Sequence, residues 1–219
     1  MINKKDVSRR NFIKQSSLGV GAGIVGLSAP HLRTEVNENK KLPKEVVVAS
    51  VDLKGLWPDR TRESRIRRIL ERMEEVTGLQ PDIVCLPELF DTMWVNEKRP
   101  LSEVAEDEKF PGPVTSRIAA FAKKNNCYVV CPIFTKKDGN FYNSSLLLDR
   151  QGNIAGVYHK IHPVKSEILH DPLGTVLPGA LDQSIIETDF GKVGMQICYD
   201  ANWKDGWDNL KKKGADIVL

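Results

Sequence analysis

Three polar side chains stand where apolar runs of the sequence end. Glu88 follows the run 83–87, Lys160 closes the run "IAGVYHK", and Cys198 closes the run "GKVGMQIC". The carboxyl ends of strands in α/β sheets are where ligands bind, so we expect the three side chains to share one pocket. Taken singly, the residues have ordinary interpretations: a cap or surface acid, a solvated cation and a small core residue.

Together, the three side chains supply the parts of an acyl transfer from a C–N bond. A thiol becomes a strong nucleophile when a neighbouring base takes its proton or a neighbouring cation stabilises the thiolate. The Glu88 carboxylate can take that proton and later activate water. The Lys160 ammonium, or a backbone N–H just past Cys198, can stabilise the negative oxygen of a tetrahedral intermediate. This combination predicts hydrolysis through a thioester on Cys198.

The runs that end in these residues belong to an alternation of strands and helices. Apolar and β-branched runs predict buried strands at 45–53, 81–90 and 127–134. Apolar residues at helical spacing predict helices at 61–78 and 111–126. Turn residues predict a meander with turns at 138–140 and 151–153, and another hairpin with its turn at 189–191. A short helix at 207–213 and a strand at 214–219 follow. The pattern predicts an α/β layered fold with a mixed sheet.

The charge balance differs between the N-terminal leader and the rest of the chain. The sequence has 219 residues and a formal net charge of +3. Residues 1–33 hold six of the 32 Lys and Arg but one of the 29 acidic residues, so residues 34–219 carry a net charge of −2. The basic excess therefore belongs to the leader, and the body gives no argument for nucleic-acid binding.

The leader has the features of an export signal. Its segment "SRRNFIK", residues 8–14, resembles a twin-arginine signal, and a Gly-rich apolar stretch follows it. We therefore expect a signal peptide at 1–32, a polar linker at 33–44 and one domain at 45–219. The predicted location is periplasmic or extracellular, with a membrane anchor retained if Pro30 hinders cleavage.

Export would place the four cysteines in an oxidising compartment. Cys127 and Cys131 flank "YVV" in a predicted strand, which separates them by roughly 13 Å, too far for a disulfide. Cys85 lies in "DIVCLP" and is expected in the core. The absence of a C-x-x-C pair disfavours a zinc site or a thioredoxin-like motif.

Three blocks of the sequence, "LPELF", "YHKIHP" and "GMQICYDANW", resemble in this order the signature blocks of the carbon–nitrogen hydrolase (nitrilase) superfamily. The resemblance runs from about residue 46 to the last residue. It implies an α/β nitrilase-like αββα sandwich with mixed sheets and a Glu-Lys-Cys triad. Glu88 would be the general base, Lys160 the stabiliser of the oxyanion and Cys198 the nucleophile. It also implies that the Tyr199 backbone N–H is a second oxyanion donor and that Glu167 positions the substrate.

Within the superfamily, the "CYD" block resembles the amidase and carbamoylase branches more than the true nitrilases. The resemblance therefore implies hydrolysis of a small linear amide or N-carbamoyl compound, without a metal or organic cofactor. Family members continue with further strands and a helix, so the domain is expected to be incomplete at its C-terminus. A homodimer or larger assembly is expected of the full-length protein.

Two other interpretations stay open. His162 shares a predicted strand face with Lys160 and could be the base of a thiol–histidine hydrolase. His159 points to the opposite face, which disfavours a metal site formed by the two histidines. A binding protein that keeps the fold without activity is the third interpretation, and it predicts no acyl labelling of Cys198.

The remaining polar and aromatic residues near the blocks have structural interpretations. Asn143 and Ser144 are expected to be polar groups of a turn or strand. Tyr199, Trp203 and Trp207 are expected to be packing residues.

Overall fold

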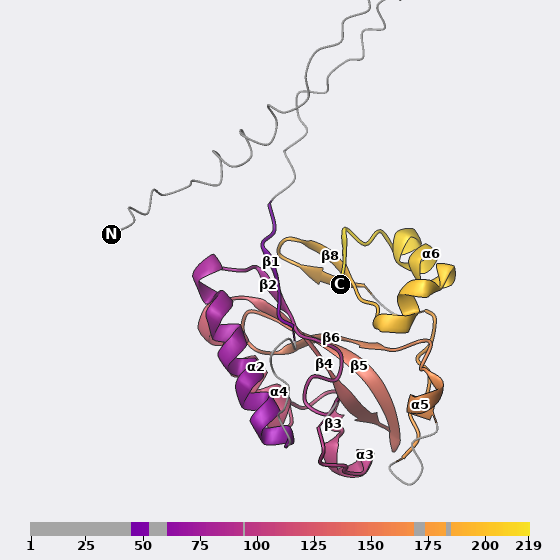
Figure 1. Ribbon diagram of the computed structural model, residues 1–219. Helices are drawn as coiled ribbons and strands as arrows, with labels where there is room; N and C mark the ends of the chain where they lie inside the picture. The colour runs from indigo at the N-terminus through magenta and orange to yellow at the C-terminus, as the bar shows by residue number, and fades with distance from the viewer. Residues whose placement is uncertain (1–44, 53–60, 94, 169–173, 183–184) are drawn as a thin grey trace, which may run out of the picture. The chain divides into compact units, whose positions relative to one another are not determined.

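The computed structural model describes residues 45–52, 61–93, 95–168, 174–182 and 185–219. The predicted signal segment and linker, residues 1–44, lie outside this part of the chain, so both stay predictions. The described residues form two sheets, one with strand order β1-β2-β4-β5-β6 and β3 beside β4, the other with order β7-β8-β9 (Figure 1). In this part of the chain no helix has the length and apolar character that crossing a membrane requires.

The larger sheet is mixed, as the sequence predicts. Its parallel strands are β1 (Val48–Ser50), β2 (Ile83–Cys85), β3 (Glu106–Asp107) and β4 (Tyr128–Lys137). Its antiparallel meander continues from β4 through β5 (Asn140–Leu148) and β6 (Ile154–His159). Asp138 and Gly139 join β4 to β5 with φ of 49° and 80°, the left-handed conformation that a two-residue hairpin turn requires. The predicted meander is confirmed, and β1 is shorter than the predicted strand.

Two amphipathic helices cover one face of the larger sheet (Figure 1). They are α2 (Arg62–Val76), capped by the Thr61 side chain, and α4 (Pro113–Asn125), which ends where Asn126 adopts φ 50°. Their buried faces pack on the strands through Ile66, Ile69, Met73, Val114, Ile118 and Phe121. Burial of these apolar faces, rather than helix propensity alone, stabilises the layer.

The other face of the larger sheet packs on the smaller sheet. The smaller sheet consists of β7 (Ile186–Thr188), β8 (Gly191–Gly194) and β9 (Ile217–Val218). Its Ile186 and Val193, together with Ile197 from the connection after β8, join one apolar cluster with residues of β2, β4, β5 and β6. Helix α6 (Lys204–Lys213) covers its outer side, where Leu210 lies against Gly194. The layers therefore run helix, sheet, sheet, helix, which confirms the predicted sandwich.

The short elements lie in the connections. They are the helices α3 (Leu101–Val104) and α5 (Lys165–Ile168) and the 3₁₀ helices η1 (Thr77–Leu79) and η2 (Cys198–Asn202).

Two boundaries differ from the sequence prediction. Strand β8 ends at Gly194, so Cys198 does not close a strand but opens η2. Helix α6 begins at Lys204 rather than at residue 207. Two backbone hydrogen bonds of Asp200 explain both differences: its N–H donates to the Ile197 carbonyl, and its carbonyl accepts from the Trp203 N–H. They form a tight turn where the sequence predicts first the end of a strand and then irregular chain.

Candidate active site

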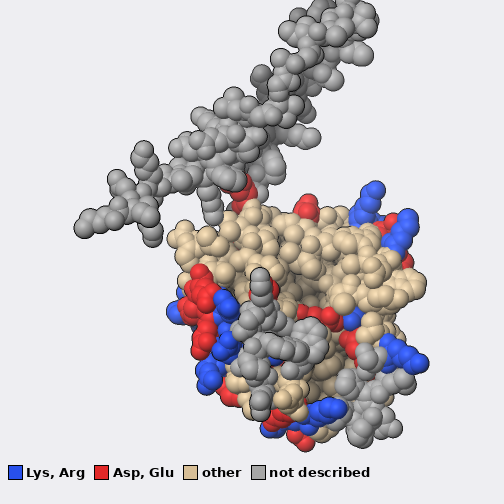
Figure 2. Space-filling model, viewed as in Figure 1, with Lys and Arg blue, Asp and Glu red and all other residues tan. Residues whose placement is uncertain are grey.

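The two sheets bring the candidate residues to one place. Asn143 of β5 and Lys160, directly after β6, lie on the side of their strands that faces the smaller sheet, and the Lys160 backbone N–H donates to the Asn143 carbonyl at 2.8 Å. Glu88 lies three residues past β2, and Glu167 lies in α5. Cys198 comes from the connection that follows β8. The face drawn in Figure 2 is hollowed near its centre, and charged atoms lie inside the hollow.

The Lys160 ammonium lies between two carboxylates. Its Nζ donates to Glu88 Oε1 at 2.7 Å and to Glu167 Oε2 at 2.9 Å. The side chains of Lys160, Glu167 and Glu88 are 2%, 9% and 19% exposed, so the group is largely removed from water. Loss of one member of such a buried ion pair leaves an uncompensated charge, so the three side chains hold one another in place.

The two glutamates also share an amide. Asn143 Nδ2 donates to Glu88 Oε1 at 2.8 Å and to Glu167 Oε1 at 2.5 Å, and the residue is fully buried. The Val164 backbone N–H donates to Glu167 Oε2 at 2.7 Å. Asn143 therefore orients both carboxylates, a role that its interpretation as an ordinary strand residue missed. No local signal in the sequence marks this role, because Asn143 stands beside two other buried polar residues, Ser144 and Ser145.

The charge state of Lys160 follows from this environment. Burial acts to lower the pKa of Lys160, but its hydrogen bonds and ion pairs with Glu88 and Glu167 outweigh burial and raise the pKa above its ordinary value. Lys160 is therefore a cation at neutral pH. It can stabilise negative charge but cannot serve as the base.

Cys198 faces this group from η2, the turn that follows β8 of the smaller sheet. Burial raises the pKa of the Cys198 thiol, the Glu88 charge and its hydrogen bond with the thiol raise it further, and Lys160 acts in the opposite direction. The backbone N–H of Tyr199 also hydrogen-bonds to the Cys198 sulfur. The thiol is therefore protonated in the resting site and has Glu88 as the neighbour that can accept its proton.

The backbone at the two reactive residues is strained. Cys198 has φ 48° and Leu89, directly after Glu88, has φ 47°. This left-handed conformation is uncommon for residues other than glycine, asparagine and aspartate, and it costs about 1–3 kcal/mol for each residue. The surrounding hydrogen bonds therefore hold the Glu88 and Cys198 turns in shapes that the chain would not adopt alone.

The histidines occupy other positions. Strand β6 ends at His159, so the alternation that placed His162 beside Lys160 does not continue. The His162 ring lies 3.0 Å from Asp200 Oδ1 and stacks on Trp203 with ring centroids 4.7 Å apart. His159 lies on the opposite face, with Nδ1 2.8 Å from Ser144 Oγ and Nε2 3.0 Å from Glu108. The Cys198 thiol donates its hydrogen bond to the Glu88 carboxylate, and not to the His162 ring.

Two further expectations concern cysteines and aromatic residues. All four cysteines are free. The three aromatic residues that were expected to pack are instead partly exposed, at 40% to 44%: Tyr199, Trp203 and Trp207. In the described part of the chain, no cluster of three or more His, Cys, Asp or Glu side chains is arranged to hold a metal ion.

Comparison with known families identifies the family of the chain. Residues 47–219 match the family model described as carbon–nitrogen hydrolase. The chain belongs to the carbon–nitrogen hydrolase family. Relatives include a nitrilase of Pyrococcus abyssi, 33% identical over 165 residues, and an omega-amidase of Saccharomyces cerevisiae, 27% identical over 194 residues. These alignments cover 74% and 84% of this chain but 58% and 65% of the relatives, so the chain spans about three fifths of their length.

Solved structures agree on the fold. A carbon–nitrogen hydrolase from Helicobacter pylori G27 superposes with a TM-score of 0.60 at 20% identity, covering 79% of this chain and 58% of that one. An amidase from Nesterenkonia sp. superposes with a TM-score of 0.61 at 16% identity, covering 82% and 66%. At this level of identity the likeness shows a nitrilase-like α/β fold with mixed sheets, as the sequence predicts.

Proposed function

We propose that the protein hydrolyses a linear amide or an N-carbamoyl group through a thioester on Cys198, with Glu88 and Lys160 as its partners. The observation that carries the proposal is the buried Glu88–Lys160–Glu167 group facing the thiol, with Glu88 hydrogen-bonded to both Lys160 and Cys198. A base, a fixed cation and a nucleophile are thereby in contact before substrate arrives.

Acylation begins with proton transfer. Glu88 takes the thiol proton as the Cys198 sulfur attacks the amide carbon, which avoids a free thiolate in a site that disfavours it. The carbonyl oxygen becomes negative and is stabilised by the Lys160 ammonium and the Tyr199 backbone N–H. Glu88 then gives the proton to the departing nitrogen, and ammonia or an amine leaves the thioester.

Deacylation uses the same groups in reverse roles. Glu88, again ionised, removes a proton from a water molecule that attacks the thioester carbon. The acid product leaves, and the proton returns to the Cys198 sulfur through Glu88. Glu167 and Asn143 keep Lys160 and Glu88 oriented through both halves, and Glu167 is also the carboxylate next to the incoming substrate.

The relatives support an amide as the substrate class. Several are described as omega-amidases, from Xenopus tropicalis, Danio rerio and Saccharomyces cerevisiae. In a variant of the Nesterenkonia amidase, the acetamide moiety of fluoroacetamide is covalently added at the active site cysteine. The Pyrococcus abyssi relative is described as a nitrilase, so nitriles belong in any test.

The proposal is tested by ammonia release from short amides, N-carbamoyl amino acids and nitriles. Cys198→Ala should abolish release, whereas Cys127→Ala, which changes a buried thiol outside the site, should keep at least half of the wild-type rate. We expect amides or N-carbamoyl compounds to be cleaved and nitriles not. Release from nitriles alone would contradict the substrate class, and equal rates in wild type and Cys198→Ala would contradict the mechanism.

A further inference from the structure

One carboxylate near the site has no part in the chemistry proposed above. Asp200, two residues after Cys198, is 1% exposed. Its Oδ1 accepts from the His162 backbone N–H at 2.7 Å and lies 3.0 Å from the His162 ring Nδ1. Its Oδ2 accepts from the Tyr158 hydroxyl at 2.8 Å. The two Asp200 oxygens therefore lie within hydrogen-bond distance of a backbone N–H, a ring nitrogen and a hydroxyl.

Two more donors complete the cluster around Asp200. The backbone N–H groups of Ile161 and Ile197 each lie 3.3 Å from Oδ2. Ile161 directly follows Lys160, and Ile197 directly precedes Cys198. One buried carboxylate therefore receives donors from the residue after the candidate oxyanion stabiliser and from the residue before the candidate nucleophile.

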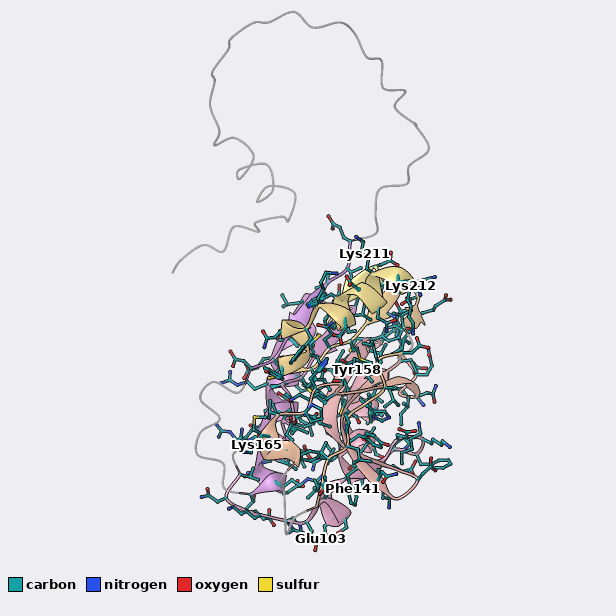
Figure 3. The ribbon with its side chains drawn as sticks, turned by 90° about the vertical axis from the view of Figure 1, so that its right-hand side faces the viewer. Glu103, Phe141, Tyr158, Lys165, Lys211 and Lys212 are labelled. Atoms are coloured by element: carbon teal, nitrogen blue, oxygen red, sulfur yellow. The ribbon has the colours of Figure 1, made fainter. Side chains whose placement is uncertain are left out.

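These donors come from different layers of the sandwich. Tyr158 belongs to β6 of the larger sheet, and Ile161 and His162 belong to the loop after it. Ile197 and Asp200 belong to the connection after β8 of the smaller sheet. Figure 3 labels Tyr158, which lies on β6, near the centre of the described domain. The carboxylate therefore joins the sheet that holds Glu88 and Lys160 to the segment that holds Cys198.

We propose that Asp200 is a positioning residue that fixes the Cys198 sulfur against Glu88 and Lys160. The inference rests on the proposed function and assigns the part of the site that sets its geometry. Cys198 holds a strained φ of 48°, and the Asp200 side chain and backbone close the turn on both sides of it, since the Asp200 N–H also donates to the Ile197 carbonyl at 3.0 Å. Without this carboxylate the turn is free to relax, and the sulfur moves relative to the other two groups.

The test uses Asp200→Asn, which keeps the shape of the side chain. In either orientation the new amide NH₂ faces at least one backbone N–H that the carboxylate now accepts, so the turn loses a hydrogen bond and gains a repulsion. A displacement of about 1 Å in a reacting group costs about 100-fold in rate, so kcat for ammonia release should fall about 100-fold while KM changes less than about threefold.

A second readout does not require turnover. The rate of Cys198 alkylation by iodoacetamide, measured against pH, reports the pKa of the thiol. Burial and the neighbouring Glu88 raise that pKa in the wild type. In Asp200→Asn the sulfur leaves this environment, so the alkylation midpoint should shift downward, toward the ordinary thiol value. A role in stability alone would lower the unfolding temperature without moving this midpoint.

The matched control is Asp205→Asn. Asp205 is an exposed carboxylate 3.7 Å from the same His162 ring, but its Oδ1 accepts from the Gly206 N–H within its own helix. This variant removes the same charge from beside the same histidine and should keep wild-type kcat and midpoint.

Tyr158→Phe keeps the inference testable if Asp200→Asn does not fold. It removes a single donor to Asp200 and should lower kcat by about three- to tenfold with a smaller downward shift of the midpoint. Where both variants fold, Tyr158→Phe should cause no further change in kcat or in the alkylation midpoint of a protein that already carries Asp200→Asn. The reason is that the Tyr158 hydroxyl acts through the Asp200 carboxylate.

The outcomes separate this inference from the proposed function. A wild-type protein that releases no ammonia from any substrate refutes the proposed function, and the alkylation midpoints then decide the role of Asp200. An unchanged midpoint in folded Asp200→Asn overturns the inference, as does unchanged kcat in an active protein. If only Tyr158→Phe folds, a midpoint equal to that of the wild type overturns it.

Discussion

The thiol of Cys198 is held in a state that discourages its reaction in the absence of substrate. Its pKa is raised by burial and by Glu88, so it stays protonated near neutral pH. The Lys160 pKa is also raised, by two carboxylates, so the cation persists. A protonated thiol beside a carboxylate and a lasting cation is suited to transfer of its proton to Glu88 while the sulfur attacks a bound substrate.

We expect the Glu88→Gln substitution to raise the reactivity of the Cys198 thiol toward alkylation and to lower the rate of amide hydrolysis. The glutamine lacks the charge that raises the pKa of the Cys198 thiol, so that pKa should fall and iodoacetamide should alkylate Cys198 faster at pH 8 than in the wild type. Ammonia release should fall by at least about 100-fold, because the general base is lost. Peptide mapping identifies the alkylated cysteine, with Cys198→Ala as the control. An unchanged alkylation rate would show that Glu88 does not act on the thiol.

Single residues of this site differ in how well the sequence reveals them. Glu88, Lys160 and Cys198 end apolar runs, and their chemistry is complementary, so they could be singled out and the structure brings them together. Asn143 and Asp200 could not, because nothing local distinguishes a buried polar residue with distant partners from an ordinary strand or turn residue. Their partners lie 55 and 24 positions away for Asn143 and up to 42 for Asp200.

At the scale of elements, helix α4 shows how a distant side chain defines a helix start. Its N-cap residue, Gly112, has no side chain to cap the helix. Glu106 of β3 replaces it, because its carboxylate accepts from the Val114 N–H at 2.6 Å and the Thr115 N–H at 2.9 Å. A Cβ on Gly112 would lie 2.5 Å from the Glu106 side chain, so glycine makes room for this carboxylate. The negative charge is also favourable at a helix N-terminus.

Glu106→Gln should therefore destabilise the protein by about 1–2 kcal/mol, because one buried backbone N–H loses its acceptor and the charge is removed. Urea unfolding measures this as a lower midpoint with an unchanged slope. Glu103→Gln, which changes an exposed acid of the neighbouring α3, should shift the free energy of unfolding by less than about 0.5 kcal/mol. Equal shifts in the two variants would refute the capping role.

The elements themselves could be predicted where their apolar pattern is long. Helices α2 and α4 and the meander β4–β6 lie close to their predicted ranges, because periodicity over ten or more residues is a strong signal. The ends of short strands could not be predicted. Met195 and Ile197 continue the apolar alternation of β8, but the chain leaves the strand at Gly194 and then turns at Cys198.

On the scale of the whole molecule, the candidate site exists because two sheets pack face to face. Gly156 of β6 allows the approach, since a Cβ there would lie 2.4 Å from Ile186 Cδ1 of β7. The layered architecture could be predicted from the three sequence blocks and the family they indicate. The contacts between the sheets could not, because they depend on pairs of residues far apart in the sequence. Export, assembly into an oligomer and incompleteness at the C-terminus stay predictions.

The most direct test of the whole account is a search for the acyl-enzyme. The protein is mixed with a short amide that it hydrolyses, quenched with acid during turnover, digested and mapped by mass spectrometry. The account predicts the acyl group of the substrate on Cys198, removed by neutral hydroxylamine as a thioester is, and no adduct on Cys85, Cys127 or Cys131. Ammonia release at the wild-type rate by Cys198→Ala, or an acyl group carried by a different residue, would contradict it.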